Sequence, residues 1–392
     1  MVNVSVVKDS DTERRVIKSI ELLGGMGKFV DKGDIVLIKP NLVYPAPPPV
    51  TTNPVVVGIL VKLAREAGAK KVLVGEGGAP VLKSNDGVTT KKTFKETGMQ
   101  QVVEDNGGEI VCLDEESCEM VEVQEGVIYK KVKLYKDIVK SNKLIGVPVI
   151  KTHYDTDVSL GIKGWHGVIA DEEKFWKFHR DDIHQKLVDL IKVLKPCLTV
   201  IDGTKAMEGL GPLGGESLDM NLVVASSDVV AADSVTATIM GFDPFDIDHI
   251  RIANMQGVGE SNLEKINVLG SKIEEVKKNF KKPYNKITGI WKNVTVIEGG
   301  VCRACRSRTR WSLEQLDKLG KLDGKKLTVI LGVDPYLPNP DEVEGKIVVV
   351  GDCACYFARS FLRLTSDKCL FVRGCPPIPV PEWVPSYCNA IH

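Results

Sequence analysis

The sequence has no excess of charge of either sign. Its 392 residues include 52 Lys and Arg and 52 Asp and Glu, so the formal net charge at pH 7 is zero. Proteins that bind nucleic acid or an anionic membrane surface usually carry a basic excess. The balance therefore argues against both kinds of partner.

Long apolar runs are also missing. The stretch 55–61 is broken by Lys62 and is far shorter than the roughly 20 residues needed to cross a bilayer. The N-terminus reads MVNVS, soon carries charges and has no apolar signal core. We therefore expect no membrane span and a cytoplasmic location. In that compartment ten cysteines are more often metal ligands or redox groups than a disulfide framework.

The chain shows neither an internal repeat nor a low-complexity tract, and apolar segments alternate with amphipathic ones. This alternation predicts an α/β fold. The length favours two or three domains. We expect a parallel or mixed sheet, in one lobe or two, over residues 1–285, and a smaller α/β domain over residues 286–392. The predicted strands are 34–38, 71–74, 144–150 and 198–201, and the predicted helices are 55–67, 182–194, a helix capped by Ser227, and 272–282.

Four cysteines follow predicted strands near the end of the chain. Cys302 and Cys305 follow the strand 293–297, Cys353 follows 346–350, and Cys375 follows 369–372. Parallel strands deliver their following loops to one edge of a sheet. The four thiols can therefore converge, and four thiolates suit an iron–sulfur cluster or zinc.

The residues around these cysteines resemble a known domain. The segments EGGVCRAC (298–305), GDCA (351–354) and GCPP (374–377) are similar to the proximal-cluster domain of nickel–iron hydrogenase small subunits. The complex I subunit that carries the terminal cluster is a more distant relative. The resemblance implies a flavodoxin-like sheet and one 4Fe–4S cluster held by Cys302, Cys305, Cys353 and Cys375. The segment between the second and third cysteine is shorter than in hydrogenases, and no further cysteine-rich module follows.

Alternatives to this ligand set remain open. Structural zinc also takes four thiolates, although zinc sites more often use paired knuckles. Cys355 and Cys369 are close enough in sequence to replace Cys353 or Cys375. Buried cysteine often behaves as a small apolar residue, and this is the interpretation for Cys112, Cys118, Cys197 and Cys388.

A second group of polar residues follows strands in the first three-quarters of the chain. If these strands are parallel, the residues meet in one crevice. A Gly-rich loop (209–215) and the pair Asp228 and Asp233 can join them. The strand-end residues are Lys39, Asn41, Glu76, Lys151, His153 and Asp202, with Lys163 and His166 on the segment GIKGWHG.

The residue types suggest a site for a small anion. Lys39, Lys151 and Lys163 favour a carboxylate or phosphate. His153 and His166 can move protons near neutral pH. Glu76 and Asp202 can hold a metal or neutralise the lysines, and with Lys39 and Asn41 they are the candidates for holding a cofactor. Each residue taken alone is more often structural, and the Gly-rich loop lacks a nucleotide-binding pattern.

The same region resembles domain-of-unknown-function family 362. The shared segments are IKPN (38–41), TTNP (51–54), KTH (151–153), GIKGWHG (161–167), the run from IDG to LGPLG (201–214) and DVVAADSVTATIMGFDP (228–244). The resemblance implies an architecture and an association with cluster domains, but no reaction. A fainter similarity links the region to the N-terminal domain of lactate racemase, which tethers a nickel cofactor through a lysine. The sequence gives no separate sign of that cofactor.

Three functions fit these patterns. The first is an iron–sulfur oxidoreductase in which one cluster exchanges electrons with an anionic substrate, a cofactor or an electron-carrier protein. The second is a non-redox enzyme, such as an isomerase or hydrolase, with a structural cluster or zinc. The third is a scaffold that delivers a cluster or metal to a partner. The oligomeric state is left open.

Overall fold

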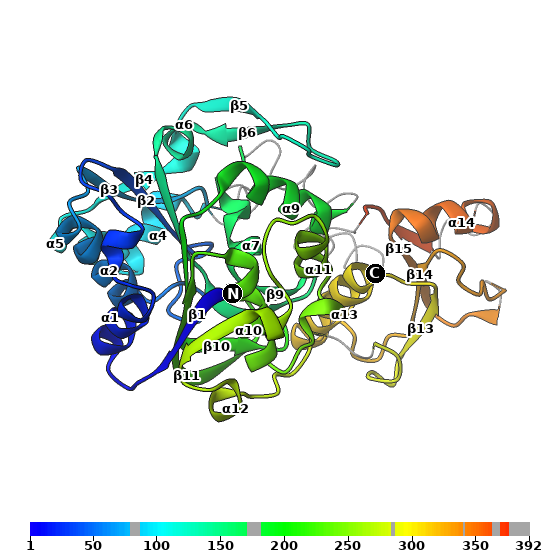
Figure 1. The fold of residues 1–392 in the computed structure, drawn as a ribbon. Coiled ribbons are helices and arrows are strands. Elements are labelled where there is room, and N and C mark those ends of the chain that lie inside the picture. Colours follow the sequence, from blue (N-terminus) through cyan, green and yellow to red (C-terminus); the bar gives the residue numbers. More distant parts are fainter. Residues whose placement is uncertain (79–86, 171–181, 284–286, 340–341, 363–368, 376–392) are drawn as a thin grey trace. The chain divides into compact units, whose positions relative to one another are not determined.

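The structure is a computed structural model that describes all residues except 79–86, 171–181, 284–286, 340–341, 363–368 and 376–392 (Figure 1). It contains two compact units, one ending at Lys281 and the other beginning at Lys282. Both units combine strands and helices, so the fold class is mixed α/β. Pro376, Pro377 and Cys388, considered above, lie outside the described residues.

A mixed sheet of ten strands runs through the first unit. Eight strands lie in the order β12-β1-β11-β10-β7-β2-β3-β4, and β8 and β9 extend the sheet beside β10. The run from β10 through β7, β2 and β3 to β4 is parallel, whereas β11 is antiparallel to both of its neighbours. The strands are β1 (Val2–Lys8), β2 (Ile35–Pro40), β3 (Lys71–Glu76), β4 (Glu109–Cys112), β7 (Lys143–Val147), β8 (Val149–His153), β9 (Asp157–Ser159), β10 (Leu198–Glu208), β11 (Glu216–Ser226) and β12 (Ile266–Gly270).

Helices cover both faces of this sheet (Figure 1). Alternate residues of a strand point to opposite faces, so Val36 and Ile38 pack with α1 and α2, whereas Leu37 packs with the cluster that includes α9, α10 and α11. Each buried aliphatic side chain contributes roughly 1.5–3 kcal/mol. The helices are α1 (Thr12–Leu22), α2 (Pro54–Glu66), α4 (Thr90–Glu96), α5 (Met99–Asp105), α6 (Lys136–Lys140), α7 (Gly161–Gly164), α9 (Ile183–Leu194), α10 (Val229–Ile239), α11 (Asp248–Met255) and α12 (Ile273–Val276). A separate hairpin is formed by β5 (Cys118–Glu122) and β6 (Lys131–Tyr135).

The second unit is built on four parallel strands. They lie in the consecutive order β13-β14-β15-β16. The reversal of strand order that marks a flavodoxin-like sheet is absent among these four described strands. The elements are β13 (Val294–Gly299), α13 (Arg303–Lys318), β14 (Leu327–Gly332), β15 (Lys346–Val350), α14 (Asp352–Leu362) and β16 (Cys369–Val372).

Two predicted strands differ from the structure. The predicted strand 144–150 is two strands, β7 and β8, because Pro148 between them has no N–H for the ladder. Its carbonyl instead accepts from the Asp202 amide (2.8 Å). The predicted strand 198–201 continues to Glu208, because β11 pairs with it along its whole length. Asp202-Gly203 therefore lies inside a strand, next to an irregularity in the register, and is not a turn.

Two predicted helix ends also differ. Asp228, not Ser227, caps α10, because its carboxylate accepts from the amides of Val230 (2.9 Å) and Ala231 (3.0 Å). The predicted helix 272–282 is only the short α12. After α12 the chain pairs with the end of α10, where the Phe280 amide donates to the Met240 carbonyl (2.9 Å). Four lysines crowded into residues 277–282 also disfavour continuing the helix.

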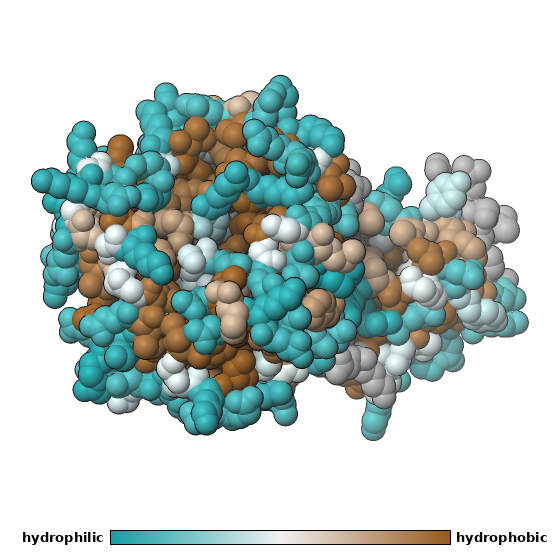
Figure 2. Space-filling view, in the orientation of Figure 1, coloured by the Kyte–Doolittle hydropathy of each residue, from teal (hydrophilic) through white to brown (hydrophobic). Residues whose placement is uncertain are grey.

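Among the described residues, none of the helices is both long and apolar enough to span a bilayer. Figure 2 shows hydrophilic residues interspersed with apolar ones on the visible face of the first unit.

Candidate functional site

The carboxyl ends of β2 and β3 bring Lys39 and Glu76 together. Their side chains form an ion pair of 2.7 Å and are only 3% and 6% exposed. The Lys39 ammonium also donates to the Pro40 carbonyl (3.0 Å). The Glu76 carboxylate accepts from the amides of Leu42 (3.2 Å) and Gly77 (2.9 Å). Each of the two charged groups thus has hydrogen bonds in addition to the ion pair itself. Such additional bonds help to offset the cost of burying an ion pair.

The Pro-rich loop between β2 and α2 folds back over these strand ends. Its Val50 carbonyl accepts from Asn41 Nδ2 (2.8 Å) and from Lys151 Nζ (2.7 Å). The Thr52 hydroxyl accepts from the Asn41 amide and donates to the Val147 carbonyl on β7, both at 2.8 Å. One loop thus joins Asn41 and Lys151, which the sequence assigned to the same crevice.

Lys151 on β8 is a buried cation of this crevice. Its side chain is fully buried, with 1% of the residue exposed. Burial and the nearby charge of Lys163 lower the pKa of Lys151 to about 7, while Asp202 and Glu76 oppose this shift. Lys151 therefore exchanges between amine and ammonium near neutral pH, and Lys163, Asp202 and Glu76 are its electrostatic neighbours.

Asp202 lies on β10 and is fully buried. Its carboxylate accepts from the amides of Asn53 (2.9 Å) and Thr204 (2.8 Å). Burial raises the pKa of Asp202, while these bonds and the charge of Arg15 oppose the shift. Asp202 thereby fixes the end of the Pro-rich loop against the sheet.

His153 and the Gly-rich loop meet at the end of β8. The His153 Nδ1 accepts from the Asp155 amide (3.0 Å), and the residue is 4% exposed. The Thr152 hydroxyl donates to the Gly209 carbonyl (2.9 Å), and the Tyr154 amide donates to the Gly211 carbonyl (3.2 Å). A Cβ on Gly211 would overlap the Thr152 carbonyl. The Gly-rich loop therefore packs directly against the strand that carries Lys151 and His153.

The segment GIKGWHG closes the other side of the crevice. Asp233 on α10 fixes its start by accepting from the amides of Gly161 (2.6 Å) and Ile162 (2.9 Å). A Cβ on Gly167 would lie 2.2 Å from Glu76 Oε1 and 2.9 Å from Lys39 Nζ. Glycine at 167 thus lets the backbone reach the ion pair. His166, the preceding residue, is half-buried.

Asp233 and Asp228 have structural roles. Asp233 is fully buried, and burial raises its pKa to about 7 against the effect of its two backbone bonds. Asp228 caps α10, and its second carboxylate oxygen accepts from the Glu260 amide (2.9 Å). Their hydrogen bonds hold α7, α10 and the segment at Glu260 in place.

In the second unit, backbone contacts bring three cysteine segments to one edge of the sheet. The Gly351 amide donates to the Val372 carbonyl (2.8 Å), and the Asp352 amide donates to the Gly374 carbonyl (3.0 Å). The start of α14, with Cys353, therefore lies beside Gly374-Cys375. A Cβ on Gly351 would lie 3.2 Å from the Cys305 Sγ, so α13 reaches the same edge.

Cys305 is the buried member of this group. It is 8% exposed, whereas Cys302, Cys353 and Cys375 are exposed. A hydrogen bond with Cys302 and burial raise the pKa of the Cys305 thiol strongly, and the charges of Cys302, Cys375 and Cys353 raise it further. The other three thiols are thus electrostatic neighbours of Cys305. Among the described residues, no three Cys, His, Asp or Glu side chains are placed to hold a metal ion as they stand.

Cys355 and Cys369 belong to a different environment. Cys355 packs in an apolar cluster with Val349 and Ala358, and Cys369 packs against its margin. The Cys355 thiol donates weakly to the carbonyls of Val349 (3.6 Å) and Val372 (3.7 Å). Burial raises the pKa of Cys355 to about 12. Cys112, Cys118 and Cys197 likewise pack against apolar clusters of the first unit.

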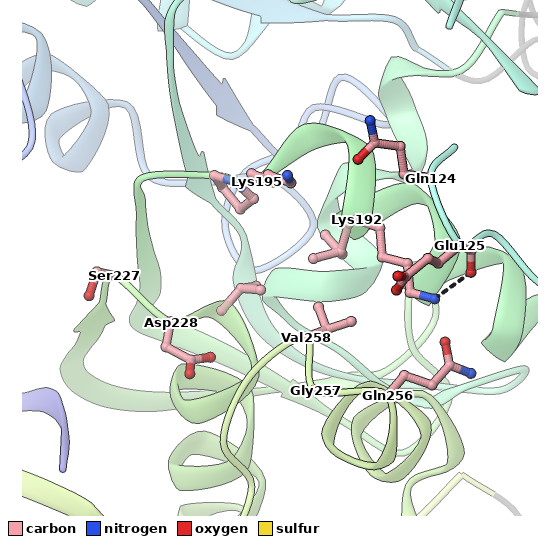
Figure 3. Close-up of a pocket in the computed structure, with 12 residues that line it drawn as sticks. Gln124, Glu125, Lys192, Lys195, Ser227, Asp228, Gln256, Gly257 and Val258 are labelled. Carbon is pink, nitrogen blue, oxygen red and sulfur yellow. Dashed lines mark hydrogen bonds between the residues drawn. The ribbon is translucent and has the colours of Figure 1, made fainter. Parts of the chain in front are cut away.

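A polar cavity of about 530 Å³ lies away from these residues. Its lining, drawn in Figure 3, includes Lys195 and Pro196 before β10 and Ser227 after β11. The cavity therefore lies where β10 begins, whereas Lys39 and Glu76 lie where their strands end. Lys192 on α9 donates to the Glu125 carbonyl in its wall (2.8 Å). Of the polar residues singled out from the sequence, Asp228 lines this cavity, whereas Lys39, Glu76, Lys151 and Asp202 do not, so we do not assign the cavity to the candidate site.

Arg15 is a crevice residue that the sequence did not single out. It is fully buried, and its guanidinium donates to Thr204 Oγ1 (2.9 Å), next to Asp202. Its neighbours in sequence, DTERRVIK, are mostly charged and by themselves suggest an exposed helix. The helical periodicity of α1, however, places Arg15 on the same buried face as Val16 and Ile20.

Comparison with known proteins places the crevice inside a described family. The family described as "Domain of unknown function (DUF362)" matches residues 36–238, the span that carries Lys39 through Asp202. A thylakoid-associated protein of Synechocystis sp., sll1697, is 30% identical over 278 residues, covering 67% of this chain and 81% of the relative. The lactate racemase apoprotein of Thermoanaerobacterium thermosaccharolyticum superposes with a TM-score of 0.42 at 14% identity, covering 89% of this chain and 83% of the racemase.

Proposed function

The chain belongs to the DUF362 family, and on that premise we propose that it is an iron–sulfur redox protein whose first unit binds a small anion. The ligands in this proposal are Cys302, Cys305, Cys353 and Cys375. The proposal covers a single 4Fe–4S cluster and extends to an electron-carrier protein as its partner.

One observation carries the proposal. Segments separated by up to 70 residues in sequence end at one sheet edge, where the buried Cys305 thiol has the other three thiols as electrostatic neighbours. Four clustered thiols with no metal repel one another once ionised, and a metal centre removes this cost by binding the thiolates. Three exposed thiols and one buried thiol also leave an open side for the inorganic core.

The chain's own residues have distinct roles in this unit. Gly351 and Gly374 adopt positive φ (90° and 129°), which brings the backbone close to the thiols. The Gly351 amide donates to the Val372 carbonyl, and the Gly374 amide donates to the Asp352 carboxylate, so these hydrogen bonds hold the two glycine segments together. When bound, a 4Fe–4S cluster supplies one-electron transfer, and its potential depends on such hydrogen bonds and on exposure.

The first unit supplies the anion site in this proposal. Lys151 and Lys163 bring two basic side chains close together, and the charge of Lys163 contributes to the lowered pKa of Lys151. A bound carboxylate or phosphate would favour the ammonium form of Lys151. His153 and His166 would hold or move a proton beside it, while Asn41 and Asp202 fix the loop that closes the site.

Anaerobic reconstitution with iron and sulfide tests the cluster. The expected product has an iron-to-sulfide ratio of about one, little zinc and a broad visible absorption. Cys302→Ala and Cys375→Ala are each expected to lose that absorption. A protein that takes up zinc and no sulfide would replace the redox proposal with a structural metal site.

A second candidate rests on Lys151. A buried amine with a pKa of about 7 is suited to act as a general base at neutral pH without any electron transfer. In this non-redox enzyme the second unit would be structural. Turnover that survives reduction of the cluster but is lost in Lys151→Met would select it.

A third candidate, a cluster-delivery scaffold, rests on the exposure of Cys302, Cys353 and Cys375. Rapid transfer of the cluster to an acceptor apoprotein, with no effect of Lys151→Met, would select that function.

A further inference from the structure

The polar cavity at the start of β10 is formed by segments that are far apart in sequence (Figure 3). They are the loop between β5 and β6 (123–130, the hairpin loop), the end of α9, the start of α10 and the end of α11. Its volume of about 530 Å³ lies within the range of small-molecule sites, roughly 300–1,000 Å³. A ligand here should be polar, because most of the lining side chains are charged or polar, among them Gln124, Glu125, Lys192, Lys195, Ser227 and Asp228.

Hydrogen bonds join three of these segments into one frame. Asp189 on α9 is fully buried and accepts from the amides of residues 127–129 in the hairpin loop, at 2.8–3.0 Å. Gln185, also on α9, donates to Asp189 Oδ1 (2.9 Å) and exchanges two hydrogen bonds with Gln256 of α11 (2.7 and 3.3 Å). The hairpin loop, α9 and α11 are therefore held in place without a ligand.

Asp228 fixes the fourth segment. Besides capping α10, its carboxylate accepts from the Glu260 amide (2.9 Å), which joins the start of α10 to the chain that follows α11. A Cβ on Gly259 would lie 2.3 Å from Asp228 Oδ1, so glycine at 259 permits this close approach. Both oxygens of Asp228 are thus bonded to amides within the wall of the cavity.

Two other charges of the lining are not engaged in this way. Lys195 ends α9, Glu125 lies in the hairpin loop, and both are exposed. Among the described residues, neither side chain has an ion-pair or hydrogen-bond partner, and they do not pair with each other. Lys192 donates to the Glu125 carbonyl (2.8 Å), which leaves the Glu125 carboxylate unbonded. The cavity therefore presents one cation and one anion from different segments.

Both of these residues adopt a backbone conformation that favours glycine. Their φ angles are 44° at Lys195 and 55° at Glu125, and they are two of the four non-glycine residues with positive φ in the described part of the chain. Glycine adopts this conformation without strain and is the usual residue at a helix end of this type. Backbone strain of this kind concentrates at functional sites. Here it places two opposite charges on the same cavity.

We propose that this cavity binds a small zwitterion of the amino-acid class, with its carboxylate at Lys195 and its ammonium at Glu125. A ligand that carries both charges is complementary to both side chains, whereas a ligand with a single charge is attracted by one and repelled by the other. Gln124, Ser227 and the Lys192 ammonium supply hydrogen bonds to its remaining polar groups. The proposal does not depend on the cysteines or on the crevice.

Calorimetry with the full chain tests the ligand class. The probes are L-glutamine and glycyl-L-glutamine, two zwitterions whose charges are spaced differently. We expect saturable binding of at least one of them. Its N-acetyl and C-terminal amide derivatives, which each lack one charge, should bind at least about tenfold more weakly. Absence of binding by both zwitterions, or equal binding of the derivatives, would overturn the proposal, whatever the outcome of cluster reconstitution.

Two glycine variants test the assigned residues. Lys195→Gly and Glu125→Gly each remove a charge and relieve the backbone strain, so thermal stability should not fall. Affinity for the bound probe should fall at least about tenfold in each, whereas Lys195→Arg, which keeps the charge, should retain it. Glu122→Gln is the control, because Glu122 is exposed and pairs with Lys131 (3.0 Å) outside the cavity. Parental affinity in either glycine variant would contradict the proposed binding site.

Discussion

Lys39 and Glu76 form a fully partnered ion pair across two neighbouring parallel strands, with 2.7 Å between Nζ and Oε2. Removing one charge from such a pair leaves the other buried and uncompensated. A change that breaks this pair is therefore expected to lower the stability of the first unit.

We predict that Glu76→Gln lowers the free energy of unfolding by about 3 kcal/mol, since Lys39 keeps its charge and loses its partner. Denaturant titration measures this change. Glu109→Gln is the matched control, because Glu109 pairs with Lys71 at 2.9 Å on the surface, with side chains 62% and 44% exposed. Its cost should stay below about 1 kcal/mol. Equal costs would show that the buried pair is not coupled to folding.

Gly167→Ala should disturb the Lys39–Glu76 pair by placing a methyl group against it. The added methyl would meet Glu76 and Lys39 at under 3 Å, and overpacking of this kind costs about 2 kcal/mol. Phosphate affinity, followed by calorimetry, should fall with it. Gly164→Ala is the control, because the nearest atom to its new methyl is Pro148 Cβ at 3.3 Å. A Gly167→Ala protein with parental stability and affinity would exclude this contact from the site.

Lys151 should give the protein a distinctive pH dependence. Its pKa falls from 10.5 to about 7 on folding, so between these values the unfolded chain binds one more proton than the folded chain. Stability must then rise with pH across this window, by up to about 1.4 kcal/mol per pH unit from this group. Below pH 7 the burial penalty is fully present.

Lys151→Met should remove that slope. We expect the variant to be more stable than the parent at pH 6 and to lose this advantage as the pH approaches 10. Unfolding titrations at pH 6, 8 and 10 measure the difference. Parallel stability profiles for the two proteins would mean that Lys151 keeps its ordinary pKa.

Much of the fold was predictable because local signals agreed with the tertiary structure. The predicted strands at β2, β3, β15 and β16 and the helices α2 and α9 are confirmed. The errors arose where long-range pairing decides the outcome. Pro148 divides one predicted strand into two, and β11 extends β10 past Asp202. The strands that pair with these segments are distant in sequence, so a short stretch of sequence does not reveal them.

The polar strand ends of the first unit were foreseeable from the rule that parallel strands end together. That rule does not say which of these charged side chains form ion pairs with one another. Glu76 is committed to Lys39, and Lys151 bonds a carbonyl of a distant loop. Arg15 could be found only from its burial and its contact with Thr204. The α/β class and the meeting of these strand ends therefore follow from the sequence, whereas the pairing of their charges does not.

The central claim is that one particular set of four thiols binds iron. Cys353 and Cys355 offer the sharpest comparison, since they are two residues apart on α14, one exposed and the other packed in an apolar cluster. Iron and sulfide should be counted after anaerobic reconstitution of Cys353→Ala and Cys355→Ala. We predict that Cys353→Ala loses most of its bound iron and that Cys355→Ala retains the parental amount. Full iron binding by Cys353→Ala, or its loss in Cys355→Ala alone, would contradict the proposed cluster site.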